Sequence, residues 1–138
     1  MPDDQEAQRS RYERGQELLS GMHGTGGAAV MAALDGVAPD FARLIVEFAY
    51  GDVHGRPGLS RRERQIATIA ALTALGHATP QLKVHVEAGL NAGLSREEVV
   101  EIIMQMAVYA GFPAAVNGLL AAKEVFAARE EGETRPKA

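Results

Sequence analysis

Apolar positions along most of the chain recur every three or four residues, which is the spacing of an amphipathic helix. The clearest example follows Asp40, where Phe41, Leu44, Ile45 and Phe48 fall on one helical face. The alternation of apolar and polar residues that is typical of strands is nearly absent. We therefore predict an all-α fold of about six to seven helices.

Glycine, proline and capping residues mark where these helices begin and end. The expected helices cover residues 5–21, 27–36, 40–50, 60–76, 79–93, 96–110 and 113–129. The glycine-rich stretch 24–27 is expected to be a flexible turn, and 51–58, with three glycines and Pro57, is expected to be a loop. We place a single domain over residues 1–130 and a disordered tail over residues 131–138.

Two of the expected helices start alike. Ser60 is followed by Glu63, and Ser95 by Glu98, so each pair can form a capping box. The second box lies 35 residues after the first, which fits a duplicated helix-turn unit, although capping boxes also arise by chance.

The segment 96–110 is apolar on nearly all sides, because only Glu101 and Gln105 interrupt its apolar residues after Val99. A helix of this kind is buried on most sides. In a chain of 138 residues, association of subunits is an economical way to bury it, so we expect a homo-oligomer.

The composition is ordinary for a globular protein and excludes several functions. A net charge of -4, with 14 scattered lysines and arginines, argues against nucleic-acid binding. No apolar run approaches the roughly 20 residues of a membrane helix. Residues 1–6 are acidic and lack the apolar region of a signal peptide, so we expect a cytoplasmic protein. The absence of cysteine excludes disulfides, thiol nucleophiles and dithiol redox chemistry.

His85, on the expected helix 79–93, can exchange a proton near neutral pH. It shares a helical face with Gln81, Ala88 and Gly89, and the two small residues would leave room for a ligand. The alternative is a core or interface histidine that bonds to a backbone carbonyl.

The stretch 50–57 brings Asp52, His54 and Arg56 within five positions. An arginine here can bind a carboxylate with two parallel hydrogen bonds. The alternative is a turn in which Arg56 pairs with a local acid. The four histidines show no zinc-ligand spacing, so we expect no metal site.

From Phe41 to Phe126 the chain resembles the carboxymuconolactone decarboxylase family, which belongs to the wider alkylhydroperoxidase-like superfamily. The segments that carry the resemblance are residues 48–59, 68–76, 81–94, 105–115 and 122–126. The resemblance implies an all-helical subunit that assembles into a homotrimer or homohexamer, with pockets where helices meet. It also implies a small-molecule substrate and no cofactor.

The peroxidase branch of this superfamily carries a Cys-x-x-Cys pair four residues ahead of a histidine. Counting back from His85, the two cysteine positions fall on Ala78 and Gln81, so the resemblance excludes thiol peroxidase chemistry. A glutamate ahead of that motif corresponds to Gln65.

The decarboxylase branch keeps a histidine that matches His85 and an Arg-Pro-Gly that matches residues 56–58. It carries bulky aromatic residues where this chain has Tyr50 and His54, and a histidine in the last helix where this chain has Leu120. These differences leave the substrate open.

The family reaction makes three physical demands. Loss of CO2 from the γ carbon of carboxymuconolactone pushes electrons onto the lactone carbonyl, and the resulting dienolate is protonated at the α carbon. A cation must orient a carboxylate, donors must meet the lactone oxygen, and an acid must supply the proton.

The resemblance implies one residue or more for each demand. Arg56 is the cation, Gln65 or Tyr109 is the donor to the lactone oxygen, and His85 is the acid. The predicted catalytic residues are His85, Gln65 and Tyr109. The predicted substrate-binding residues are Arg56, His54 and Tyr50. Two other functions stay open: a protein that binds or isomerises a small molecule, and a helical oligomer without an active site.

Overall fold

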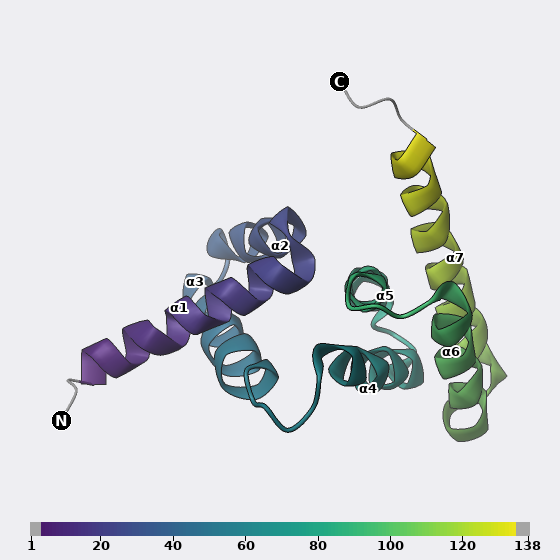
Figure 1. Ribbon diagram of the computed structural model, residues 1–138, viewed down its shortest axis with the longest axis horizontal. Helices are drawn as coiled ribbons and strands as arrows, with labels where there is room; N and C mark the ends of the chain where they lie inside the picture. The colour runs from purple at the N-terminus through teal and green to yellow at the C-terminus, as the bar shows by residue number, and fades with distance from the viewer. Residues whose placement is uncertain (1–3, 135–138) are drawn as a thin grey trace. The chain divides into compact units, whose positions relative to one another are not determined.

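The computed structural model describes the backbone of residues 4–134, and over this part of the chain it contains helices and no strand (Figure 1). The side chains described are those of residue 4 and residues 10–134. The helices are α1 (Asp4–His23), α2 (Thr25–Asp35), α3 (Pro39–Leu44), the π-helix η1 (Ile45–His54), α4 (Arg61–Leu75), α5 (Thr79–Asn91), α6 (Arg96–Ala110) and α7 (Phe112–Thr134). The predicted all-α fold is confirmed. None of the described helices is long and apolar enough to cross a membrane.

These helices form two compact units, Met1–Ser60 and Arg61–Ala138. In the first unit, α1 packs along η1. Helix α2 packs against α1 and α3, and α3 packs against η1. Its buried apolar residues include Leu19, Met22 and Val46.

The stretch 24–27 is not the flexible turn that we expected. Only Gly24 lies between helices, with a positive φ of 57°, and α2 begins at Thr25. Gly27 is buried within α2, where an added Cβ would lie 2.7 Å from Cγ of Leu19. The glycine therefore lets α2 pack against α1, and this is why a stretch rich in glycine is helical.

The predicted loop at 51–58 begins later than expected, because η1 continues without a break to His54. The reason is again a close approach of two helices. A Cβ at Gly51 would lie 2.7 Å from the carbonyl oxygen of Arg11, and one at Gly15 would lie 2.0 Å from that of Val46. Glycine at these positions brings the backbones of α1 and η1 into contact, and it does not end the helix.

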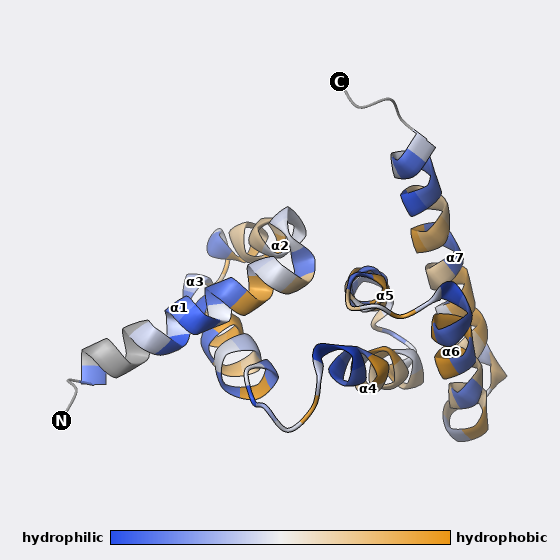
Figure 2. Cartoon of the chain, in the orientation of Figure 1, coloured by the Kyte–Doolittle hydropathy of each residue, from blue (hydrophilic) through white to orange (hydrophobic). Residues whose placement is uncertain are grey.

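The second unit is a bundle of α4, α5, α6 and α7 around one core. Buried apolar side chains from all four helices meet in it: Ile69, Leu82, Val86, Val99, Ile103, Ala121, Ala122 and Val125. The start of α4 is strongly hydrophilic and its later turns are apolar, as Figure 2 shows. The predicted capping box of α6 is confirmed, since Glu98 N donates to Ser95 Oγ over 3.0 Å and Ser95 N donates to Glu98 Oε1 over 3.1 Å.

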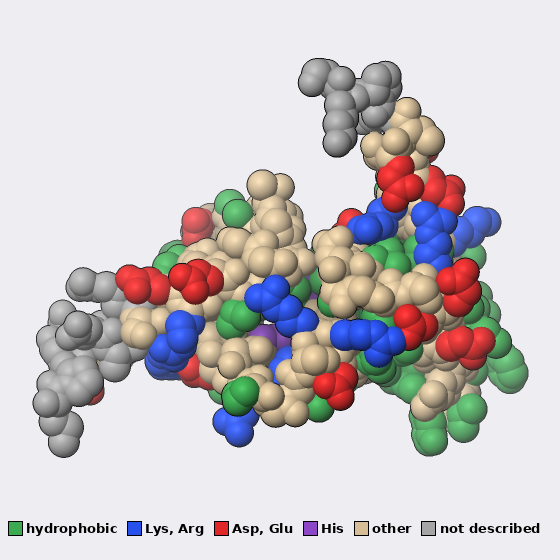
Figure 3. Space-filling model, in the orientation of Figure 1, with side chains coloured by type: hydrophobic (Ala, Val, Ile, Leu, Met, Phe, Trp, Pro, Cys, Tyr) green, Lys and Arg blue, Asp and Glu red, His purple; other side chains and the backbone are tan. Residues whose placement is uncertain are grey.

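Helix α6 is buried on one face only within the subunit, where Val99 and Ile103 enter the core. Val108, Tyr109 and Phe112 are 78%, 77% and 78% exposed at the turn from α6 into α7. Hydrophobic side chains gather at this end of the two helices in Figure 3. The prediction that α6 is covered on most sides therefore does not hold for a single subunit.

Helix α7 ends at Thr134, five residues beyond the expected end at Arg129. Residues 131–134, which we had placed in the tail, are thus helical. Residues 135–138 of the predicted tail lie outside the described residues.

Candidate active site

Gln65 on α4 and His85 on α5 form a hydrogen-bonded pair inside the second unit. The Gln65 side chain is 0% exposed, and its Oε1 lies 3.0 Å from Nδ1 of the half-buried His85. An amide oxygen can only accept, so Nδ1 of His85 donates its hydrogen to Gln65. In the neutral imidazole the second nitrogen, Nε2, is then the basic one, and it is the nitrogen that takes up and releases a proton.

Gly89 is closely packed beside this pair. It lies one turn after His85 on α5, and an added Cβ would lie 2.9 Å from Cδ1 of Ile69 and 3.0 Å from Cδ1 of Leu94. Ile69 itself lies one turn after Gln65 on α4. The sequence suggested that the small residues beside His85 leave room for a ligand. That interpretation is wrong at Gly89, because core side chains fill the space.

The alternative interpretation, a core or interface histidine bonded to a backbone carbonyl, does not describe Nδ1 of His85. The partner that holds Nδ1 is the side chain of Gln65, which comes from another helix. Tyr109, the third predicted catalytic residue, is not held in this pair, because its side chain is largely exposed on α6.

A second cluster of polar rings lies in the first unit, around Tyr50. Its Oη lies 2.8 Å from Nε2 of His23, and the two rings meet edge to face with centroids 5.7 Å apart. The His54 ring stacks on Tyr50, with centroids 5.4 Å apart and planes 20° from parallel. Tyr50 and His54 were predicted site residues, but His23 was not, because its place on α1 gives no spacing signal.

Burial shifts the pKa of two rings in this cluster, Tyr50 and His23. It raises the pKa of Tyr50, so the phenol keeps its hydrogen at neutral pH. Burial, with a smaller contribution from His54, lowers the pKa of His23, so this imidazole is neutral there.

The acid of the 50–57 stretch is bound by an arginine from α1. Asp52 accepts from Arg11 through two hydrogen bonds, from Nε over 3.0 Å and from Nη2 over 2.5 Å. The hydrogen bond to Arg11 lowers the pKa of Asp52. Arg56 is exposed in the connection that follows η1, where its backbone N donates to the carbonyl of Val53 over 3.1 Å.

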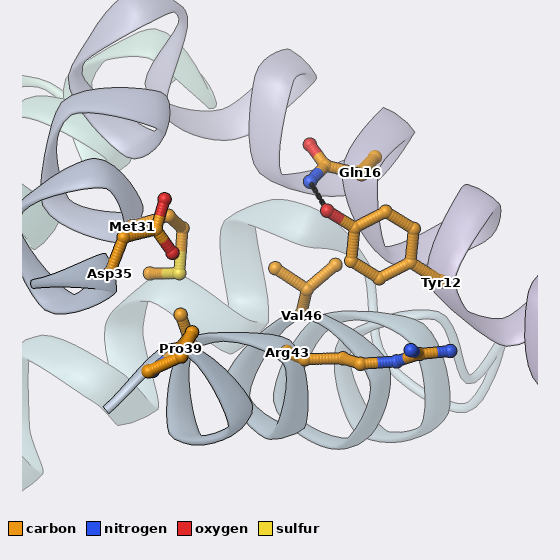
Figure 4. Close-up of a pocket in the computed structure, with 8 residues that line it drawn as sticks. Tyr12, Gln16, Met31, Asp35, Pro39, Arg43 and Val46 are labelled. Atoms are coloured by element: carbon orange, nitrogen blue, oxygen red, sulfur yellow. Dashed lines mark hydrogen bonds between the residues drawn. The ribbon is translucent and has the colours of Figure 1, made fainter. Parts of the chain in front are cut away.

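A cavity of about 310 Å³ lies within the first unit, among α1, α2, α3 and η1 (Figure 4). Polar side chains in its wall are hydrogen-bonded: Gln16 donates to Tyr12 Oη over 2.8 Å, and Arg43 donates to Glu47 over 2.6 Å. None of the predicted site residues lines it. Among the described residues no group of three or more histidines and acids is placed to hold a metal ion.

Comparison with known proteins supplies the family. The pattern of the Carboxymuconolactone decarboxylase family matches residues 39–124, which is more than half of the chain. The chain belongs to the carboxymuconolactone decarboxylase family. Its fold is thus the all-α, alkylhydroperoxidase-like fold of that family.

The chain is similar to three proteins of known name. It is 37% identical to a 4-carboxymuconolactone decarboxylase of Acinetobacter baylyi over 84% of this chain and 87% of the relative. It is 34% identical to an uncharacterized 15.0 kDa protein of Paracoccus denitrificans, over 73% of this chain and 76% of the relative. A nitrosuccinic acid decarboxylase of Metarhizium robertsii is 32% identical over 56% of this chain and 53% of the relative.

All six predicted site residues fall inside the segment that matches the carboxymuconolactone decarboxylase family. His23 lies outside it, since the match begins at residue 39. The structure therefore adds to the predicted set a histidine that the family pattern does not include.

Proposed function

We propose that this chain is a cofactor-free carboxy-lyase that acts on a small lactone or an enolisable carboxylic acid. The observation that carries the proposal is the Gln65–His85 hydrogen bond, because it fixes the tautomer of a histidine that can serve as an acid. The family and two relatives that are named decarboxylases support the reaction class. The first substrate to test is 4-carboxymuconolactone.

In the proposed reaction the C–C bond to a carboxylate breaks and CO2 leaves. The bonding electrons shift the ring double bond and are taken up by the lactone carbonyl, so no metal or organic cofactor is needed as an electron sink. The imidazolium form of His85 then delivers its Nε2 proton to the α carbon, which leaves the neutral tautomer with Nδ1–H bonded to Gln65, and solvent restores the Nε2 proton before the next turnover. Each turnover consumes one proton and releases one CO2.

The remaining residues have supporting roles in this proposal. Arg56 binds a carboxylate of the substrate, for which its planar guanidinium is suited. Gln65 acts through His85, because its amide oxygen accepts from Nδ1. Tyr109 stays the predicted donor to the lactone oxygen, and Tyr50 and His54 stay predicted substrate-binding residues.

We also propose that the protein works as a homotrimer or homohexamer. The support comes from the apolar side chains left exposed where α6 turns into α7, since large apolar patches are rare on soluble monomers. The family resemblance leads to the same expectation.

The test is turnover of 4-carboxymuconolactone by the purified chain, followed by the loss of its ultraviolet absorbance and by CO2 release. In D2O we expect one deuterium at the α carbon of the product, because the proton comes from an exchangeable group. His85→Gln should lower kcat by about 10²–10⁴-fold, as expected for loss of a general acid.

The alternative function is a protein that binds or isomerises a small lactone without decarboxylating it. The differences at Tyr50, His54 and Leu120 from the decarboxylase branch favour it. Binding of 4-carboxymuconolactone without release of CO2 would establish this alternative and overturn the lyase.

A further inference from the structure

His23 makes the contact that fixes the hydroxyl of Tyr50. It is the last residue of α1, and its Nε2 lies 2.8 Å from Tyr50 Oη on η1. The His23 ring meets the Tyr50 ring edge to face at 81°, while His54 stacks on Tyr50 at 20°. Tyr50 is only 8% exposed. Two rings from different parts of the unit therefore restrain both the position of the phenol and the rotation of its plane.

The hydrogen bond between these residues can run in two directions. At neutral pH the phenol is protonated and the imidazole is neutral, for the reasons of burial given above. Nε2 of a neutral imidazole either accepts from the hydroxyl or donates to its oxygen, depending on the tautomer. In the first case His23 uses the phenol hydrogen. In the second case the phenol hydrogen is directed to another acceptor.

The chemistry of the proposed substrate selects between the two directions. A lactone carboxylate presents carbonyl and carboxylate oxygens, all of which are acceptors. Only the tautomer with a hydrogen on Nε2 leaves Tyr50 able to donate to such an oxygen.

We infer that His23 is a positioning residue of the substrate site: it donates Nε2–H to Tyr50 Oη and so directs the phenol hydrogen toward an oxygen of a lactone carboxylate. This inference rests on the proposed function in assigning Tyr50 to substrate binding. It adds a residue from α1 that lies outside the segment matched by the family pattern.

A double-mutant cycle tests whether His23 acts through the Tyr50 hydroxyl. Tyr50→Phe removes the hydroxyl, and His23→Phe removes the donor while keeping an aromatic ring. With 4-carboxymuconolactone as substrate, each change should lower kcat/KM about 10- to 100-fold, which is the range for a hydrogen bond to a charged or strongly polar group. The double variant should lose no more than either single variant, because both remove one interaction.

Two further variants separate positioning from a structural role. His23→Gln places an amide N–H where Nε2 was, so it should restore most of kcat/KM. Tyr12→Phe is the matched control, because it removes another hydrogen-bonded tyrosine hydroxyl of the same unit, which accepts from Gln16 over 2.8 Å. Tyr12→Phe should leave kcat/KM within about twofold of the wild-type value. This is small beside the tenfold change that corresponds to about 1.4 kcal/mol. The Nε2–H tautomer of His23 should appear directly in nitrogen-15 NMR spectra of the imidazole.

Binding of an inert lactone separates this inference from the lyase reaction. The probe is 5-oxotetrahydrofuran-2-acetate, which has a lactone and a carboxylate but no ring double bond and no carboxylate on the γ carbon. If turnover fails but this probe binds with the same non-additive losses in calorimetry, the lyase is refuted and the role of His23 stands.

Three results would overturn the role of His23. The first is turnover in which the losses of kcat/KM add in the double variant. The second is a His23→Phe variant with unchanged kcat/KM and a lower melting temperature. The third is an Nδ1–H tautomer of His23 in the NMR spectra. A wild-type protein that neither turns over 4-carboxymuconolactone nor binds the inert lactone refutes both the role of His23 and the lyase.

Discussion

The hydrogen bond between Gln65 and His85 gives the most direct test of the proposed chemistry. Gln65→Leu keeps a side chain of similar size in the core but cannot accept the Nδ1 hydrogen. Removing one partner of a buried hydrogen bond costs about 1–3 kcal/mol in the free energy of unfolding. His85 is half-buried and leucine adds apolar burial, so both effects reduce this cost. We therefore expect Gln65→Leu to lower the free energy of unfolding by about 1 kcal/mol.

The effect on turnover should be much larger than the effect on stability. Without Gln65 the imidazole can rotate and exchange tautomers, so the acid is correctly placed only part of the time. We expect kcat to fall roughly 10- to 100-fold, less than the loss in His85→Gln. In the His85→Gln background, Gln65→Leu should add little, since Gln65 acts through His85.

The pH profile of a second variant, Gln65→Glu, tests whether the side chain at position 65 controls the pKa of His85. A carboxylate beside Nδ1 favours the charged imidazolium and raises the pKa of His85. A general acid is active below its pKa, so the alkaline limb of kcat/KM should move to higher pH. The assay is the loss of lactone absorbance in buffers of constant ionic strength.

Thr73→Val is the matched control for these variants. Thr73 is buried on the same helix, and its Oγ1 donates to the carbonyl of Ile69 over 2.8 Å. The change should cost comparable stability while leaving kcat and the pH profile unchanged. The reasoning would be refuted by a Gln65→Leu variant with full kcat, or by a Gln65→Glu profile that moves to lower pH.

Four further predictions follow from the same structure. Arg56→Lys should raise KM more than it lowers kcat in steady-state assays, because lysine cannot make two parallel bonds to a carboxylate. Asp52→Asn should lower the unfolding free energy at neutral pH, because it removes the negative charge that pairs with Arg11. The difference should fade in denaturation curves as pH falls through the lowered pKa of Asp52, where the wild type loses this charge as well. Val108→Glu should give a smaller particle in light scattering, whereas Val108→Thr should not. Turnover should survive treatment with a chelator, and loss of activity that zinc restores would contradict this.

Local pattern predicted the helices well but misjudged the glycines. The apolar spacing after Asp40 correctly indicated a helix, and the Ser95–Glu98 capping box formed as expected. The glycine-rich stretches around Gly27 and Gly51 predict a turn and a loop, although both glycines lie inside helices. Their role is to admit a neighbouring side chain or backbone, and a close approach between distant segments has no signature in the local sequence.

Individual residues of the candidate site could be predicted from the sequence, but their contacts with residues on other helices could not. Its main residue, His85, could be named from its titration range and from the family motif, and Gln65 from the motif alone. The hydrogen bond between these two residues depends on how α4 packs against α5. Local sequence pattern does not predict that packing. His23 could not be found, because it lies 27 residues before Tyr50 and on another helix.

Both hydrogen-bonded pairs lie beside a glycine that is closely packed against a neighbouring helix. Gly89 lets α5 lie against Ile69 of α4, and Gln65 meets His85 one turn away. Gly51 brings η1 against the backbone of α1, and Tyr50, its neighbour in sequence, reaches His23 at the end of that helix. A methyl group at Gly51 would meet the backbone of α1 and force the two helices apart by some tenths of an ångström or more, whereas one at Gly89 would meet the terminal methyl groups of Ile69 and Leu94. Hydrogen bonds weaken quickly with such displacement, so the packing of Gly51 against α1 controls the geometry in which Tyr50 meets His23.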